Sequence, residues 1–176
     1  MPYVLRAPTL ITDFSSTTGM TLTQGTGSVA LDTDATKRTV GSASLKVIQL
    51  ASASSALVDL DCRNAALGGT GSDGFSMLAD NMVHLRSFID GPNNQNTVSL
   101  FFSNDAAGFA NYFAATVAAA QISTAAPWKN AVWDRGEGRA DWTTGEGSPS
   151  WATTIKTIRI RPAANANGTL TTWLDA

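Results

Sequence analysis

The sequence predicts an all-β protein with the architecture of a β-sandwich or a β-barrel. Two observations predict it: short runs that alternate between apolar and polar residues recur along the chain, and clusters of turn-forming residues separate them. Many short strands at such a spacing are typical of a sandwich or a barrel. With 176 residues and no internal repeat or linker, the chain is expected to form one domain with a full hydrophobic core.

The first half of the chain carries five expected strands in which a period of two is visible. Leu45 and Val47 fall on one face of their run, and Leu57 falls opposite Val58 and Leu60. The five runs cover residues 9–14, 20–24, 28–33, 42–50 and 56–62.

The second half carries five further runs, at residues 81–90, 96–104, 128–134, 154–162 and 169–175. Residues 135–150 read as a polar loop, because Gly, Ser, Asp and Pro favour turns. Ile155 and Trp151 are expected to fill one end of the sandwich, and Ile158 and Ile160 to share a strand face. The last two runs, joined by a Gly-containing turn, are expected to pair with each other.

Residues 109–121 allow two interpretations. Phe109, Tyr112, Phe113, Thr116 and Val117 recur at helical spacing, and the alanines among them favour a helix. As a strand, the same segment would place alternate residues on the inner and outer faces. Local propensity prefers the helix.

Composition and charge argue against several classes of function. The 12 Lys and Arg residues are scattered and the net charge is −2, so no basic stripe is present for nucleic acid. No apolar run reaches membrane-spanning length. A low charged fraction of 15%, with abundant Gly, Ser, Thr and Ala, favours an extracellular or virion-surface protein, although the first residues do not read as a signal peptide.

Motifs for catalysis are missing from the sequence, and an enzyme is not expected. His84 is the only histidine, Cys62 is the only cysteine, and neither a G-x-S-x-G motif nor a P-loop occurs. Cys62 therefore makes no internal disulfide and is expected to be a small packed side chain. A pair of carboxylates for glycoside hydrolysis remains open, because the sequence does not place the acidic residues relative to one another.

The order of the segments resembles the galactose-binding-like jelly roll, the β-sandwich of many carbohydrate-binding modules. The resemblance rests on "DFSSTTGMTL", "GSASLKV", "LFFSNDAAGFANYF" and the closing "GSPSWATTIKTIRIR…NGTLTTWLDA". Such modules occur beside glycan-active domains and in phage tail proteins. The resemblance implies a strand at residues 111–118, core positions for Trp128 and Trp151, and a last strand that lies near the first. It further implies that residues 1–176 are one module of a larger protein, with an N-terminal extension at about residues 1–8 and a further domain after Ala176.

Aromatic and planar polar side chains are the candidates for sugar binding, because sugars stack their C–H faces on rings and offer hydroxyls for hydrogen bonds. Trp142, amid Gly and charged residues, is the first candidate and Trp133 the second. His84 and Arg86 fall on one face of their strand and could line a polar surface or simply face solvent. Tyr112 is a further candidate.

The resemblance also implies a structural calcium ion that ties the first strand to the last. Asp175 stands at the matching place near the C-terminal end, Asp13 lies in the opening run, and the turn at Gly41 and Ser42 could supply carbonyl oxygens. Ser15 follows Phe14 where relatives commonly carry an acidic residue, which removes one carboxylate. The alternative is that Asp175 is an ordinary residue at a strand end.

Together these observations predict a non-catalytic module that binds a polysaccharide or cell-surface glycan, in a virion or outside the cell, without nucleic acid or membrane insertion. The alternative is a structural module of a phage tail or fibre that contacts other virion proteins or further copies of itself and binds no sugar. An exposed tryptophan groove would favour sugar, and an extended apolar surface would favour assembly.

Overall fold

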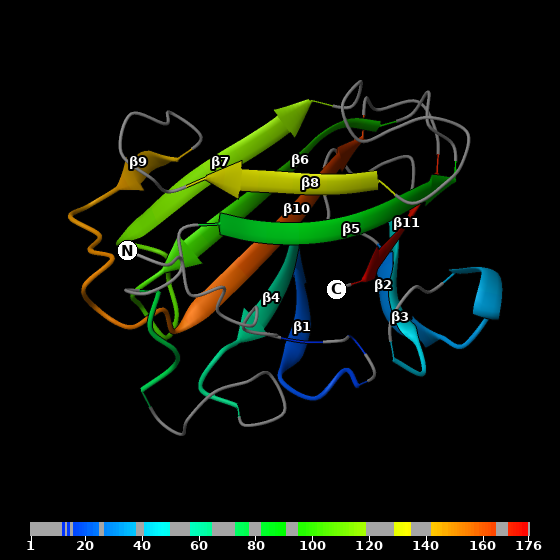
Figure 1. The fold of residues 1–176 in the computed structure, drawn as a ribbon, viewed down its shortest axis with the longest axis horizontal. Coiled ribbons are helices and arrows are strands. Elements are labelled where there is room, and N and C mark those ends of the chain that lie inside the picture. Colours follow the sequence, from blue (N-terminus) through cyan, green and yellow to red (C-terminus); the bar gives the residue numbers. More distant parts are fainter. Residues whose placement is uncertain are drawn as a thin grey trace, which may run out of the picture.

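The structure, a computed structural model, describes residues 12, 14, 16–24, 27–37, 41–49, 57–64, 73–77, 82–90, 95–118, 129–134, 142–164 and 169–175. Within these ranges the chain forms eleven β-strands and one short 3-10 helix, and the strands make two antiparallel sheets (Figure 1). The predicted all-β sandwich is therefore confirmed. None of the described helical segments is long and apolar enough to cross a membrane.

One sheet has six strands in the order β1-β4-β10-β6-β7-β9. Their bounds are β1 Met20–Gln24, β4 Leu57–Asp61, β10 Thr157–Ala164, β6 Gln95–Ser103, β7 Tyr112–Ala118 and β9 Thr143–Glu146. The long pairing of β10 with β6, from Thr157 opposite Ser103 to Ala164 opposite Gln95, forms the middle of this sheet.

The other sheet has five strands in the order β2-β3-β11-β5-β8. Their bounds are β2 Gly27–Asp32, β3 Ser44–Gln49, β11 Leu170–Asp175, β5 Met82–Asp90 and β8 Lys129–Asp134. The 3-10 helix η1, Ala35–Lys37, follows β2. In Figure 1, β5 and β8 of this sheet cross the strands β6, β7 and β10 of the six-stranded sheet.

The two closing strands do not pair with each other, which corrects the sequence-based expectation. β10 pairs with β4 and β6, whereas β11 pairs with β3 and β5 in the opposite sheet. Ile158 and Ile160 thus enter the core from one side and Leu174 from the other. The last strand also lies between β3 and β5 and not beside β1, the first described strand. Neighbours in sequence need not be neighbours in a sheet when both sheets must cover one core.

Two further segments test expectations from the sequence. Residues 112–118 form strand β7, as the resemblance implied, because pairing with β6 satisfies their backbone groups in spite of the helical propensity. Thr143–Glu146 was expected to be loop but forms the edge strand β9 beside β7. Of the expected strand at residues 9–14, only Thr12 and Phe14 are described, so that prediction lies outside the described residues.

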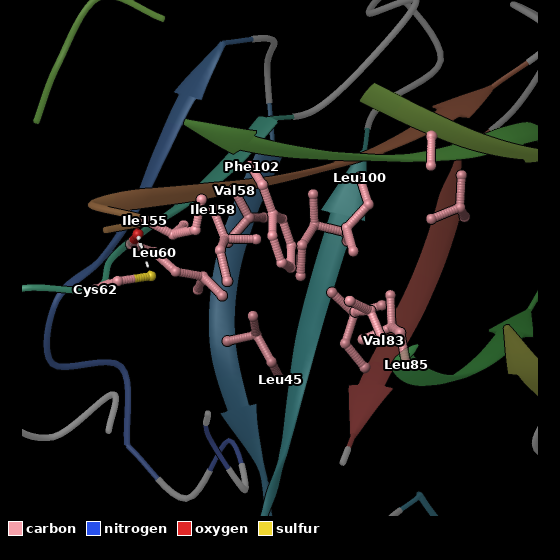
Figure 2. Packing of buried hydrophobic residues seen from close by; sticks show 14 of the residues in the cluster. Leu45, Val58, Leu60, Cys62, Val83, Leu85, Leu100, Phe102, Ile155 and Ile158 are labelled. Atoms are coloured by element: carbon pink, nitrogen blue, oxygen red, sulfur yellow. Dashed lines mark hydrogen bonds between the residues drawn. The ribbon is translucent and has the colours of Figure 1, made fainter. Parts of the chain in front are cut away.

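The core fills the space between the sheets (Figure 2). Leu45 from β3 and Leu85 from β5 belong to the same buried cluster as Val58, Leu60 and Phe102 from the six-stranded sheet. Other fully or almost fully buried members are Val47, Val98, Leu100, Ile155, Ile158, Ile160 and Leu174. The alternation read from the sequence therefore selects the inner face of these strands correctly.

Cys62 belongs to this core, as predicted. Its side chain is fully buried, its thiol donates to the backbone oxygen of Leu60, and the sulfur lies 3.5 Å from that oxygen (Figure 2). Burial raises the pKa of the Cys62 thiol to about 12, so the nucleophilic thiolate does not form at neutral pH.

Candidate functional site

A hollow of about 400 Å³ lies on the outer face of the six-stranded sheet. Strands β1, β4 and β10 supply its floor, and the segment that joins β6 to β7 supplies a wall. The lining residues are Gly19, Thr21, Asp59, Asp61, Thr157, Arg159 and residues 106–109. This size lies within the range of pockets that take small ligands.

Strand alternation explains why polar side chains gather here. Val58 and Leu60 of β4 point into the core, so Asp59 between them points outward. Likewise Ile158 and Ile160 of β10 are core residues, and Arg159 between them faces the same outer surface as Asp59.

Asp59 and Arg159 form the best-defined polar pair of the hollow. They lie directly opposite each other in the pairing of β4 with β10. Arg159 Nε donates to Asp59 Oδ1 at 2.6 Å and Nη2 donates to Oδ2 at 2.7 Å, which makes a bidentate ion pair. The arginine and aspartate side chains keep 24% and 16% of their surface exposed. Both planar groups are thus held in fixed orientation at a surface that a ligand can reach.

A second pair balances the charge of the hollow. Arg63 Nε and Nη2 donate to the two carboxylate oxygens of Asp61, each at 2.8 Å. These hydrogen bonds lower the pKa of Asp61 and raise that of Arg63. Both aspartates that line the hollow therefore carry a guanidinium partner.

The wall segment is held in one shape by hydrogen bonds at both of its ends. Thr157 Oγ1 donates to the backbone oxygen of Asp105 at 2.9 Å, and the Asp105 carboxylate accepts from the backbone N–H of Asn111 at 2.6 Å. At its tip, Gly108 and Phe109 have positive φ angles of 89° and 47°. A non-glycine residue with such a φ is uncommon and often marks a functional segment. The buried Phe109 ring lies 3.9 Å beneath the Arg159 guanidinium and orients it.

The sequence-based candidates lie on different surfaces. His84 is exposed and Arg86 half-buried on the outer face of the five-stranded sheet, opposite the buried Val83 and Leu85. Trp133 pairs in register with Val83, and its side chain lies outside the described residues.

Tyr112 is on the other side of the sandwich, on the outer face of the six-stranded sheet. Its ring makes edge contacts with Phe101 and with Phe109, at centroid distances of 5.5 and 6.1 Å. The structure therefore does not bring Tyr112 together with His84 and Arg86, but it does join Tyr112 to the wall of the hollow.

Trp142 is half-buried and contacts the core. Its ring centroid is 5.0 Å from that of Phe102 and 5.4 Å from that of Trp151. Trp151 in turn stacks on Phe113 at 4.0 Å, and so occupies the end of the sandwich as expected. Loss of Trp142 is therefore expected to lower stability. Trp128 lies outside the described residues.

The residues expected to hold calcium are only partly described. Asp175 is fully buried, Ser42 is exposed, and Asp13 lies outside the described residues. Leu174 pairs with Leu45, and this register continued by one residue places Asp175 opposite Ser44. The buried Ser44 hydroxyl has no hydrogen-bond partner among the described residues. A buried carboxylate beside such a hydroxyl fits part of an oxygen-ligand set for Ca²⁺, although no group of three or more His, Cys, Asp or Glu gathers within the described ranges.

Sequence reasoning missed Asp59, Arg159 and Phe109. The available signal was the run of acidic or basic residues at every second position in "LVDLD" and "TIRIR". That alternation indicates a polar outer face on each strand, but it does not show that the two strands are neighbours.

Comparison with known proteins shows the fold. No protein-family model and no curated protein matches the chain. A solved structure of carbohydrate-binding modules from the β-sandwich superfamily matches 94% of the chain with a TM-score of 0.58 and 16% identity, and the chain spans 59% of it. An exo-β-agarase structure matches 96% of the chain at a TM-score of 0.56 and 11% identity, and the chain spans 24% of it.

A smaller protein matches over nearly its whole length. The module TmCBM61, solved in complex with β-1,4-galactotriose, matches 96% of the chain with a TM-score of 0.51 and 11% identity, and 95% of that module is covered. At these identities the likeness concerns the backbone alone. The chain therefore has the β-sandwich fold of these carbohydrate-binding modules.

Proposed function

We propose that the domain is a non-catalytic carbohydrate-binding module that holds a glycan in the hollow between β1, β4, β10 and the 106–109 wall. The observation that carries this proposal is the bidentate pair of Asp59 and Arg159, fixed on Phe109 at the border of the hollow. Planar carboxylate and guanidinium groups offer acceptors and donors side by side, which suits the neighbouring hydroxyls of a sugar ring.

The hydrogen bonds of the two carboxylates support binding and not hydrolysis. A glycosidase needs one carboxyl group with a raised pKa as general acid. In the hollow, hydrogen bonds from Arg63 lower the pKa of Asp61, and Asp59 accepts two short hydrogen bonds from Arg159. Both carboxylates are therefore suited to accept hydrogen bonds from a ligand.

We expect the domain to act as one of several copies, each of which binds the glycan weakly. A single hollow of about 400 Å³ covers only a short part of a glycan. Several such modules on one parent protein would bind a polysaccharide much more tightly than one module does. The parent is expected to act outside the cell or on a virion, where such polymers are met.

The experiment is a glycan array followed by calorimetric titration of the best ligand. The double variant Asp59→Asn with Arg159→Gln keeps the net charge and should weaken binding at least about tenfold, because charge-assisted hydrogen bonds are lost. Arg86→Gln is the matched variant on the other sheet and should change binding less than about twofold. If Arg86→Gln weakens binding strongly and the double variant does not, the glycan binds at the surface of His84 and Arg86 instead. Binding of no glycan by the native domain would end the proposal.

We also propose that Asp175 holds a structural calcium ion, with the buried Ser44 hydroxyl beside it. Carboxylate and hydroxyl oxygens are ligands that Ca²⁺ accepts, and both residues are buried. Calcium bound only to the folded state should stabilise it by about 2.7 kcal/mol at a hundredfold excess over Kd. Melting curves with calcium and with chelator should differ for the native domain and nearly coincide for Asp175→Asn. Coincident curves for a native domain that elemental analysis shows to be calcium-free would contradict the proposal.

The alternative of a structural virion module finds less support. Of the large hydrophobic side chains whose exposure the structure describes, only Leu31 is exposed, at 40%. An extended apolar contact surface is thus not present among these side chains. Trp142, Trp151 and Trp173 are not exposed either, so the sugar proposal rests on the polar hollow.

A further inference from the structure

Two arginines two positions apart on β10 sit on the same outer face but differ in their partners. Arg159 lies 3.9 Å over the ring of Phe109, and Arg161 lies 5.1 Å over the ring of Phe101. The charge of Arg159 is matched by Asp59. In the described part of the chain, Arg161 makes neither an ion pair nor a hydrogen bond.

Arg161 is nevertheless held in place by its surroundings. Its side chain is half-buried, and its Nε is shielded from solvent without a hydrogen-bond partner in the described residues. The Phe101 ring beneath it is supported by Tyr112 at 5.5 Å. A flexible surface arginine would expose its whole guanidinium to water, so this one is a positioned cation whose charge is not paired by a carboxylate of the described residues.

The hydroxyls nearest in the sheet do not supply an anion. Ser99 pairs with Arg161 in register, but its buried hydroxyl shares a 2.9 Å hydrogen bond with Thr116 Oγ1. Neither group carries charge. The chemistry that completes this site is therefore an oxyanion, which a guanidinium binds through two parallel hydrogen bonds.

We propose that Arg161 forms an anionic subsite beside the hollow, so that the module prefers glycans bearing carboxylate or sulfate groups. This inference rests on the proposed function. Side chains two residues apart on a strand are separated by about 6–7 Å, so one oligosaccharide can reach Arg159 and Arg161 together. The hollow binds hydroxyls of the chain, and Arg161 pairs with its acidic substituent.

The test compares polysaccharides with and without their acidic groups on the same sugar backbone. Polygalacturonate is set against its fully methyl-esterified form, and carrageenan, a sulfated galactan, against chemically desulfated carrageenan, which separates carboxylate from sulfate. The native domain should bind the charged member of at least one pair roughly tenfold more tightly. That preference should weaken as salt is raised, because salt screens an accessible charge.

Substitutions assign the preference to one residue. Arg161→Gln should abolish the preference and leave binding of the neutral member within about twofold, and Arg161→Lys should retain part of it because charge remains without the planar fork. Lys156→Gln removes the same charge just before β10 and is the matched control, which should keep the full preference. Equal losses in Arg161→Gln and Lys156→Gln would overturn the proposal, since net charge alone would then explain the effect.

The outcomes separate this inference from the proposed function. If the native domain binds charged and neutral members equally, and Asp59→Asn with Arg159→Gln weakens both, the anionic subsite is wrong while the hollow remains the binding site. If none of the four polysaccharides binds and the glycan array is also blank, both proposals fail.

Discussion

The two outer faces of the sandwich use similar residues to different effect. On the five-stranded sheet, the Trp173 indole N–H donates to Asp32 Oδ2 at 2.7 Å, and the amino groups of Lys37 and Lys46 lie 4.8 and 5.5 Å from its ring centre. On the six-stranded sheet, Arg159 lies on Phe109 and pairs with Asp59. Each face thus combines a ring, a cation and a carboxylate.

What differs is access for a ligand. Trp173 is only 4% exposed and its indole N–H is satisfied by a carboxylate of the same chain, so this group is closed and structural. Arg159 and Asp59 keep more of their surface and border a hollow. A tryptophan on an outer face is therefore not by itself a sugar platform, and a polar pair without an exposed ring can be the better candidate.

Trp173→Ala should give the largest effect and test the closed face. Removing a buried indole leaves a cavity and takes one hydrogen bond from the Asp32 carboxylate, so unfolding in urea should show a loss of about 3–5 kcal/mol. Glycan affinity of the folded fraction should not change. Trp173→Phe keeps a ring but loses the hydrogen bond, so its free energy of unfolding should lie between those of the native domain and Trp173→Ala. A loss below about 1 kcal/mol in Trp173→Ala would contradict the distinction between the faces.

Arg159→Gln should give a moderate stability effect and a large binding effect. Two charge-assisted hydrogen bonds disappear and Asp59 is left without its partner, which should cost about 1.5–3 kcal/mol in the same urea measurement. Glycan titration on the same variant should show at least about tenfold weaker binding. If stability falls while affinity is kept, the pair is structural, and the two faces are alike.

Asp32→Asn should give a smaller effect that depends on pH. The hydrogen bond from Trp173, the backbone N–H of Asp34 and the charge of Lys46 together lower the pKa of Asp32 below its ordinary value of 3.8. A lowered pKa in the folded state adds stability at pH values above about 4, and this gain is lost as pH falls through the folded-state value.

Melting temperatures measured between pH 2 and 7 check this expectation. The native domain should have a higher melting temperature than Asp32→Asn at neutral pH, and the two melting temperatures should approach each other below pH 4. Asp34→Asn on the exposed side of the same turn provides the comparison for a carboxylate that does not contact Trp173. A gap that persists unchanged at low pH would show that the ionised Asp32 is not what stabilises the closed face.

The strands could be predicted because each one leaves a local signal. Val58 and Leu60 alternate with Asp59, and such a period of two needs no knowledge of the partner strand. Strand β7 was harder, since its alanines favour a helix and only the resemblance favoured a strand. Strand β9 left no signal at all, because all four of its residues are exposed at a sheet edge.

The candidate site could not be predicted for a different reason. Asp59 and Arg159 are 100 residues apart, and only the pairing of β4 with β10 places them opposite each other. The same limit explains the error in the closing strands, where adjacency along the chain suggested a hairpin between strands that belong to different sheets. Pairing across a sheet is a tertiary property, and alternation within one strand does not determine it.

Gly108→Ala should give the smallest effect and test whether the wall of the hollow must keep its shape. Gly108 has a φ of 89°, and a methyl group added to it would meet no atom within 4 Å. The cost therefore comes from backbone strain alone and should be about 1 kcal/mol in urea unfolding. Because Phe109 follows directly and orients Arg159, a shifted wall should weaken glycan binding a few-fold.

Gly41→Ala is the matched control, since the exposed Gly41 also has a positive φ, of 68°, but lies away from the hollow. If both variants lose the same stability and only Gly108→Ala binds glycan more weakly, the hollow on the six-stranded sheet is supported as the binding site. If both variants bind glycan equally well, the wall is not part of that site.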